Sequence, residues 1–265
     1  VLFRSWFFNN DDLIKKTSDY HITVNMASVR CDGLESAVNM ADEYNFYPTD
    51  GLTLFQRTGD EYFRIMGGWD VTASPGVTAR EGMNKLTPVT NWRGYCSKYN
   101  YAVGTTDGGE NAVTGYIFEK MNASDKKDVN DRGNSKGLNT LLYDFKAYKA
   151  NFILGDYFVA LGAGVTNAKP AMEGGIRTTI DQTAHIGAVT VIEKGKEKPL
   201  QEGRQSLITF EGQPVWVMQE GKFAYRVLPE FTRKAFVLTE TCPTNWIKRN
   251  RGNAKKGDLP QIGRA

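Results

Sequence analysis

The sequence has few of the residues that crosslink small proteins or bind metals. Its 265 residues include three cysteines, Cys31, Cys96 and Cys242, and two histidines. An odd number of cysteines without paired spacing excludes a disulfide framework and leaves at most one bridge. His21 and His185 have no partner at the short spacing of a zinc motif, so we expect them to be strand or turn residues. The sequence therefore predicts no metal site and no cofactor.

The sequence also lacks a strong excess of one charge and a long apolar run. Lys plus Arg number 33 and Asp plus Glu number 30, a net charge of +3. So small and scattered an excess argues against nucleic acid as a partner. The one dense basic run, residues 248–256, is compatible with a solvated loop or with a contact to a polyanion. The apolar N-terminal stretch is too short to span a membrane and is unlike a signal peptide, so we expect no membrane partner.

What the sequence does have is many short stretches of strand character. The clearest is residues 147–165, where two apolar runs flank Gly155-Asp156 and the second run alternates with a period of two. Glycine at the first central position favours a type II′ hairpin turn. Because both faces of this hairpin are apolar, we expect it to lie deep in a layered β structure rather than at a solvated edge.

Strand candidates recur along the chain at regular spacing. Residues 20–30 and 51–57 alternate, residues 6–17 are turn-rich, and residues 31–50 read as an ordered loop. Further candidates follow the hairpin at 175–183, 187–193, 205–210, 215–218, 222–227 and 235–241. No long segment keeps the 3.6-residue period of a helix. The pattern predicts an all-β sandwich rather than βαβ units.

Six segments, in this order, carry a resemblance to a known family. They are HITVNMASVRCDGLES (21–36), NFYPTDGLTLFQRTGDEYFRIMGGWDVTASPGVTA (45–79), FKAYKANFILGDYFVALGAGV (145–165), IRTTIDQT (176–183), PVWVMQEGKFAYRVLPE (214–230) and ETCPTNWIKRN (240–250). Together they resemble the central β domain of polysaccharide lyase family 8, which contains the hyaluronate, chondroitin and xanthan lyases. Because the segments are collinear and span nearly the whole chain, a chance likeness is improbable.

The resemblance implies an antiparallel β super-sandwich, galactose mutarotase-like and truncated at both ends. The chain has no initiator methionine, and we expect it to be a fragment of a longer protein. Residues 1–19 would then connect to a missing upstream helical domain, and residues 20–265 would form the central sandwich, incomplete at its C-terminus. The function so implied is cleavage of uronic-acid-containing, glycosaminoglycan-like polysaccharides by β-elimination, in a secreted or periplasmic enzyme.

By the same resemblance, the Tyr, His and Arg that carry out the elimination belong to the missing helices. The isolated chain is therefore predicted to be inactive and to supply one wall of the cleft. Departures from the family pattern include Val71, Val77 and Gln219-Glu220, and a loop that is one residue longer between Glu35 and Asn39. They leave an alternative open, a non-catalytic carbohydrate-binding or scaffolding module.

On this wall, three polar residues are candidates for the site. Glu35 would orient and charge-pair the catalytic Tyr or Arg, and Asn39 would contact the sugar or its carboxylate. Arg30 ends a strand beside the loop, where its guanidinium can bind an anionic sugar bidentately. The alternatives are a local salt bridge between Arg30 and Glu35 that pins the loop, and a turn-capping role for Asn39.

Two tryptophans complete the set of candidates. Trp69 and Trp92 can stack on the C–H faces of sugar rings, or they can pack in the core. Asp70 and Pro75-Gly76 are predicted to fix the loop that carries Trp69.

Overall fold

The computed structural model describes residues 3–31, 50–62, 65, 68–70, 73–81, 95–122, 145–171, 174–203, 205–232 and 234–242. Seventeen strands lie in these residues, and no helix does. Every strand pair is antiparallel. The predicted all-β class is confirmed. No helix capable of crossing a membrane occurs in the described part of the chain.

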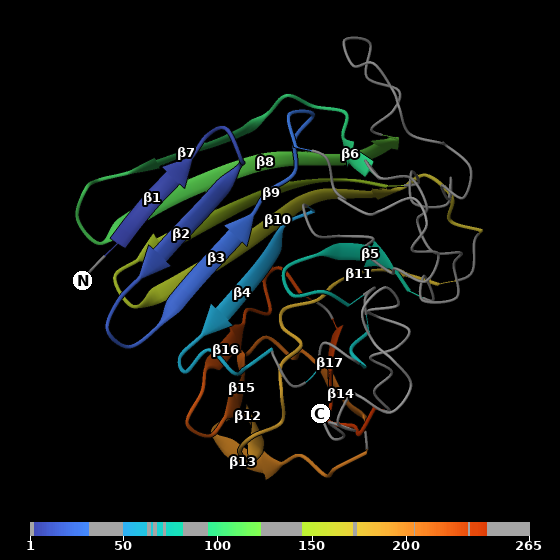
Figure 1. The fold of residues 1–265 in the computed structure, drawn as a ribbon. Helices are drawn as coiled ribbons and strands as arrows, with labels where there is room; N and C mark the ends of the chain where they lie inside the picture. Colours follow the sequence, from blue (N-terminus) through green and yellow to red (C-terminus); the bar gives the residue numbers. More distant parts are fainter. Residues whose placement is uncertain are drawn as a thin grey trace, which may run out of the picture. The chain divides into compact units, whose positions relative to one another are not determined.

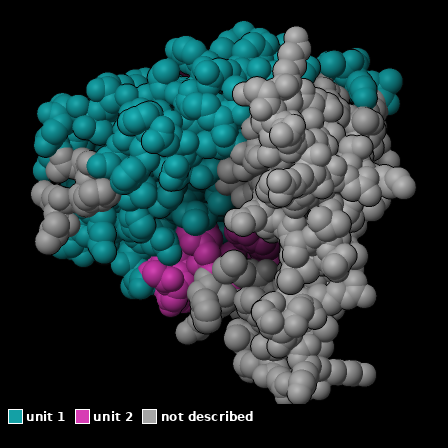
Figure 2. All heavy atoms as spheres, turned by 45° about the horizontal axis from the view of Figure 1, so that its top comes forward, with its two compact units in different colours: residues 1–58, 70–182, 246–259 teal, residues 59–69, 183–245, 260–265 magenta. Residues whose placement is uncertain are grey.

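The chain divides into two compact units (Figure 2). Unit 1 comprises residues 1–58, 70–182 and 246–259, and unit 2 comprises residues 59–69, 183–245 and 260–265. The division predicted at residue 19 is a different one, because it marks the border between the sandwich and an upstream domain. It stays a prediction.

The first sheet of unit 1 is a four-stranded meander (Figure 1). Its strands, in spatial as well as chain order, are β1 (Phe3–Phe7), β2 (Asp12–Lys16), β3 (His21–Asn25) and β4 (Leu52–Gln56). The prediction of a turn-rich segment at 6–17 is therefore wrong. Lys15 conceals the alternation of β2, because it occupies a buried position and its ammonium donates to the carbonyl oxygen of Gly155.

The second sheet of unit 1 faces the first across the main core. It contains β6 (Tyr95–Ser97), β7 (Ala102–Thr106), β8 (Asn111–Asn122), β9 (Phe145–Leu154) and β10 (Tyr157–Asn167), ordered β10-β9-β8-β6 with β7 also paired to β8. Both sheets contribute to one buried cluster, including Leu13 and Val24 from the first and Phe118 and Ile153 from the second. Each such side chain stabilises the fold by roughly 1.5–3 kcal/mol relative to an exposed one. The expected sandwich is present.

The predicted hairpin is β9–β10, with Leu154 opposite Tyr157. Of its two turn residues only Gly155 has a positive φ, 57°, as a type II′ turn requires. The expected deep burial is wrong, because β9 is the only described strand that pairs with β10, and Tyr157, Leu161 and Val165 are 72%, 43% and 46% exposed. An apolar pattern records the character of the side chains and does not show whether another layer covers them.

A two-stranded sheet of β5 (Thr78–Arg80) and β11 (Ile176–Thr178) completes the described strands of unit 1. Gly76, just before β5, lies against the backbone of Gly51 just before β4. A Cβ atom on Gly76 would lie 2.5 Å from the Gly51 carbonyl oxygen, and the φ of Gly76 is 76°. Both the approach and the left-handed conformation require glycine here.

Unit 2 is built from two smaller sheets. One has the order β13 (Lys196–Pro199), β12 (Val189–Glu193), β15 (Val215–Gln219), β16 (Ala224–Val227), and the other pairs β14 (Gln205–Thr209) with β17 (Lys234–Leu238). Val191 and Val215 from the first pack with Ile208 from the second in a separate core. The opposite face of β12 and β15 therefore points away from this core.

Gly76→Ala is expected to destabilise the protein by about 2–5 kcal/mol, from about 1–2 kcal/mol for a left-handed alanine and about 1–3 kcal/mol for overpacking. The control is Gly108→Ala, because Gly108 has a φ of 71° but no atom near its would-be Cβ. Urea unfolding of both variants measures the difference. Equal losses would show that the contact with Gly51 is unimportant.

Candidate functional site

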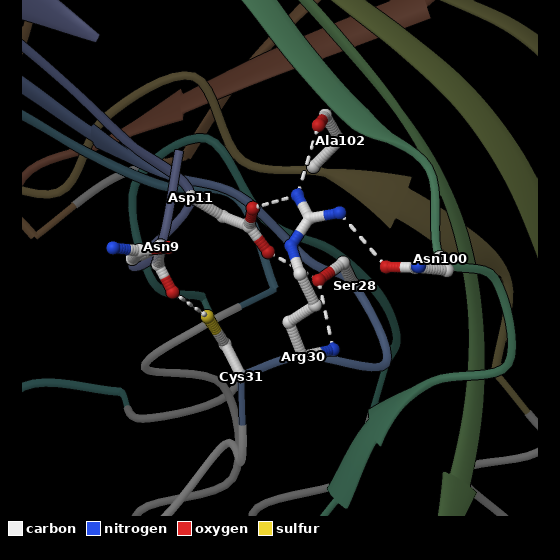
Figure 3. A network of polar contacts seen from close by, with 7 residues as sticks. All are labelled: Asn9, Asp11, Ser28, Arg30, Cys31, Asn100 and Ala102. Atoms are coloured by element: carbon white, nitrogen blue, oxygen red, sulfur yellow. Dashed lines mark hydrogen bonds and ion pairs between the residues drawn. The ribbon is translucent and has the colours of Figure 1, made fainter. Parts of the chain in front are cut away.

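Arg30 does not end a strand, contrary to the prediction, because β3 already ends at Asn25 and Arg30 lies in a turn five residues further along the chain (Figure 3). Its guanidinium forms an ion pair with Asp11, whose side chain is fully buried, while 33% of the Arg30 side chain is exposed. Nη1 donates to Asn100 Oδ1 at 2.8 Å, and Nη2 donates to the carbonyl oxygen of Ala102 at 2.9 Å. The guanidinium is thus fixed from several directions.

Asp11 connects this network to the strands. It lies in the β1–β2 turn with a φ of 56°, a conformation that aspartate adopts more readily than most residues. Its carboxylate accepts hydrogen bonds from Ser28 Oγ and from Arg30, and its carbonyl oxygen accepts one from the Met26 N–H at 2.9 Å. A buried carboxylate is costly without such partners, so Asp11 and Arg30 depend on each other.

Cys31 borders the same network, and its surroundings disfavour the thiolate. Its Sγ donates to the carbonyl oxygen of Asn9 at 3.7 Å (Figure 3). Burial, and secondarily the Asp11 carboxylate, raises the pKa of the Cys31 thiol to about 12. The reactive thiolate is therefore scarce at neutral pH.

A shallow depression of about 300 Å³ lies beside Arg30. It is lined by Trp6, Phe8, Arg30, Ala102, Val103 and Gly104. The indole packs against the backbone of β7, since a Cβ on Gly104 would lie 3.0 Å from Trp6 Cδ2, and Phe8 is 66% exposed. Aromatic surface beside a fixed cation suits a ring with an apolar face and a negative group, such as an acidic sugar.

The predicted loop residues Glu35 and Asn39, and also Trp92, lie outside the described residues, so their roles stay predictions. The structure does describe the residues on either side of the stretch 32–49. Cys31 precedes it and Asp50-Gly51 follow it, where the Gly51 N–H donates to the carbonyl oxygen of Asn25 at 2.9 Å. The chain after the stretch is therefore held at the C-terminal end of β3.

Charged and polar groups surround Asp50 and Gly51, the residues that follow the stretch 32–49. Asp50 is buried, and a Cβ on Gly51 would lie 1.9 Å from the Tyr116 hydroxyl oxygen. Lys149 Nζ donates to the carbonyl oxygen of Gly76 at 2.7 Å. Burial of the ammonium lowers the pKa of Lys149 to about 7, although the Asp50 charge opposes the shift.

Trp69, the remaining predicted residue, belongs to unit 2, whereas Arg30 belongs to unit 1. Trp69 is partly exposed, and its backbone N–H donates to the carbonyl oxygen of Ile65 at 2.8 Å. Its stacking on a sugar ring stays a prediction.

Asp70, which is predicted to fix the loop that carries Trp69, is itself held by hydrogen bonds within unit 1, and its effect on Trp69 stays a prediction. The Asp70 N–H donates to Gln182 Oε1 at 2.7 Å, and Gln182 Nε2 donates back to the Asp70 carbonyl oxygen at 2.9 Å. Arg177 Nη2 also donates to the Asp70 carboxylate at 3.1 Å. Nearby, the carbonyl oxygen of Pro75 accepts from the Thr53 N–H at 2.9 Å, and the Gly76 N–H donates to Thr179 at 2.8 Å.

Sequence reasoning missed Asp11, Trp6 and Lys149. Asp11 stands in an Asn-Asp-rich turn, where an aspartate is ordinary, and Trp6 stands in a segment predicted to be turns. Lys149 lies in the predicted hairpin on a strand that also contains Lys146, and nothing in the sequence distinguishes the buried lysine from the other. No group of three or more His, Cys, Asp or Glu suited to a metal occurs within the described ranges.

Comparison with known proteins gives the following relationships. Residues 3–259 match the family described as polysaccharide lyase family 8, super-sandwich domain. The chain is 28% identical to chondroitinase-AC of Pedobacter heparinus over 251 residues, which cover 94% of this chain and 30% of that protein. It thus spans less than a third of the length of this relative.

Solved structures of the same fold include three lyases. A chondroitinase AC lyase whose complexes with oligosaccharides have been solved has a TM-score of 0.73 at 25% identity, covering 96% of this chain and 32% of that one. Paenibacillus xanthan lyase has a TM-score of 0.67, covering 96% and 22%. The chondroitin AC lyase of Streptomyces coelicolor A3 has 0.57, covering 92% and 28%. The last two are each 19% identical and support the fold alone.

Asp11→Asn is expected to destabilise the protein by about 2–3 kcal/mol, because it leaves the Arg30 guanidinium without its buried counter-ion. The control is Lys98→Gln, which removes a more exposed pair with Glu119 and should cost less than about 1 kcal/mol. Urea unfolding at neutral pH measures both. A stable Asp11→Asn protein would contradict the mutual dependence of Asp11 and Arg30.

Lys149→Met is expected to flatten the pH dependence of the free energy of unfolding between pH 7 and 10. In the folded protein the lysine loses its proton near pH 7, whereas the unfolded chain keeps it to about pH 10.4. The unfolded state binds more protons in this window, so the Lys149 contribution to stability increases with pH.

The control is Lys146→Met on the same strand. Hydrogen bonding to Tyr99 and Tyr148 raises the pKa of Lys146, so it stays protonated in both states across the window. Urea unfolding at several pH values compares the variants. If Lys149→Met and the wild type have the same slope, the ammonium of Lys149 keeps its proton in the folded protein.

Proposed function

The chain belongs to polysaccharide lyase family 8, and we propose that it supplies the sandwich part of a lyase that cleaves uronic-acid-containing, glycosaminoglycan-like polysaccharides by β-elimination. The observation that carries the proposal is the family match over residues 3–259. The aromatic depression beside Arg30 is consistent with an acidic sugar as ligand.

In β-elimination a base removes the proton on the carbon next to the uronate carboxylate, and the glycosidic oxygen leaves with a proton. The proton is weakly acidic, so the site must neutralise the carboxylate and stabilise an enolate-like dianion. In our proposal the exposed part of the Arg30 guanidinium binds the substrate carboxylate at the wall of the cleft, while Asp11 stays its buried counter-ion. Glu35 orients the catalytic Tyr or Arg, and Asn39 contacts the sugar.

The remaining assignments complete the proposal. Trp69 and Trp92 offer aromatic faces to the polymer. The partner in the same polypeptide is an upstream helical domain that carries the proton-transferring groups, and the sandwich is galactose mutarotase-like. Because acidic polysaccharides of this class lie outside cells, the enzyme is secreted or periplasmic.

A second candidate, a non-catalytic carbohydrate-binding or scaffolding module, is favoured by two observations. The Arg30 guanidinium already has three intramolecular partners. Gln219, which stands where the family pattern has His, is buried and accepts a hydrogen bond from the Ile186 N–H at 3.3 Å. Both residues thus have structural duties that need no substrate.

The test is to express the complete open reading frame of the parent gene and assay release of unsaturated uronate from chondroitin, hyaluronan and xanthan. We expect product from at least one polymer, and none from the 265-residue chain alone. Failure with every acidic polymer would favour the non-catalytic module. Product from the isolated chain would show that the proton-transferring groups lie within it.

In the active parent enzyme, Glu35→Gln is expected to lower kcat by about 100-fold, the cost of misplacing a catalytic group. Glu43→Gln, which removes a carboxylate with no proposed role from the same loop, is the control and should leave kcat within about twofold. Near-normal turnover of the Glu35 variant would remove this residue from the site.

A further inference from the structure

Unit 2 carries a groove of about 500 Å³ on the face of its larger sheet that points away from the core. The groove is lined by Ile192, Lys194, Gly195, Gln213, Pro214, Trp216 and Met218. Its volume lies in the range that holds a ligand of a few rings. The buried side chains Val191 and Val215 alternate with Ile192 and Trp216 along the same strands, so they face the other way.

Trp216 occupies the middle of this face. Strand register places Ile192 of β12 on one side of it and Arg226 of β16 on the other. The guanidinium carbon of Arg226 lies 5.6 Å from the centroid of the indole ring. An aromatic ring is therefore combined with a cation on two adjacent strands.

Arg226 differs from Lys194, the other cation near the groove, because it has no acidic partner among the described residues. Lys194 at the rim pairs with Glu211 at 2.5 Å, but Arg226 forms no ion pair with any described residue, and it is exposed. Glu197 lies on the same face beyond Ile192, three strand spacings or about 14 Å from Arg226. The positive end of the row is thus available to an anion.

We propose that this face is a second, non-catalytic binding site for a segment of an acidic polysaccharide. The apolar face of one sugar ring packs on Trp216, and the carboxylate or sulfate of that sugar or its neighbour binds the Arg226 guanidinium. Aromatic stacking tolerates many sugars, whereas the planar cation selects acidic ones. The identity of the ligand rests on the proposed function, whereas the pairing of ring and cation does not.

The direct test is titration of the 265-residue chain with chondroitin oligosaccharides, followed by calorimetry and by tryptophan fluorescence. Trp216→Ala is expected to weaken binding at least about tenfold. Arg226→Gln is expected to weaken binding of the acidic oligosaccharide about tenfold or more, and to leave binding of the carboxyl-reduced, unsulfated oligosaccharide unchanged. Lys196→Gln removes the same charge from β13 on the opposite face and is the control.

Trp216→Phe guards against a folding defect, because it retains an aromatic face and should bind within about threefold of the wild type. The proposal is overturned if the wild type does not bind, or if both Trp216→Ala and Arg226→Gln bind as it does. It is also overturned if sedimentation shows self-association that Trp216→Ala abolishes, since the face would then be an interface between copies.

Activity of the parent enzyme separates this proposal from the previous one. With Trp216→Ala we expect a higher KM for the long polymer, an unchanged KM for a tetrasaccharide and an unchanged kcat. If the parent releases no unsaturated uronate, the lyase assignment fails and the binding results above still stand. If the parent is active and the KM of Trp216→Ala is normal for both substrates, the second site alone fails.

Discussion

The ion pair between buried Asp11 and Arg30 is the constraint on which the geometry at the end of β3 depends. A carboxylate that is removed from water needs a counter-charge and hydrogen bonds, and Arg30 and Ser28 supply them. The same contacts hold the β1–β2 turn against β3 and bring the guanidinium to Ala102 of β7. Arg30 therefore lies beside the aromatic depression because buried Asp11 needs a counter-ion. The position of Arg30 is fixed by the same contacts.

Strands with a regular apolar pattern and turns with a suitable glycine could be predicted from the sequence. A strand that places a charged side chain in the core was missed. β4 was predicted at 51–57 because its alternation is plain, and the β9–β10 turn because Gly155 suits it. β2 was missed because Lys15 takes a core position, where its ammonium reaches a backbone carbonyl oxygen. No local pattern can reveal such a lysine, because its partner lies 140 residues away in the chain.

The site shows the same division. Arg30 could be singled out from its position after a strand, but its partner could not, because Asp11 comes close only through the pairing of β2 with β3. Trp216 and Arg226, by contrast, lie ten residues apart on the two strands of one hairpin, so the position of its turn indicates their pairing. Residue type predicts what a side chain can do, whereas distant neighbours such as Asp11 and Arg30 are set by strand pairing.

The outer rim of β10 illustrates a different kind of constraint. The strand has no charged residue and no proline, the two devices that most often prevent sheets from joining edge to edge. Its register with β9 shifts between Ala163 and Thr166, where Gly164 takes a φ of 58°. This bulge twists the strand and separates the seven residues 157–163 from Thr166 and Asn167. Among the described residues, the straight template that β10 presents to a foreign strand, such as one in a growing fibril, therefore ends after these seven residues.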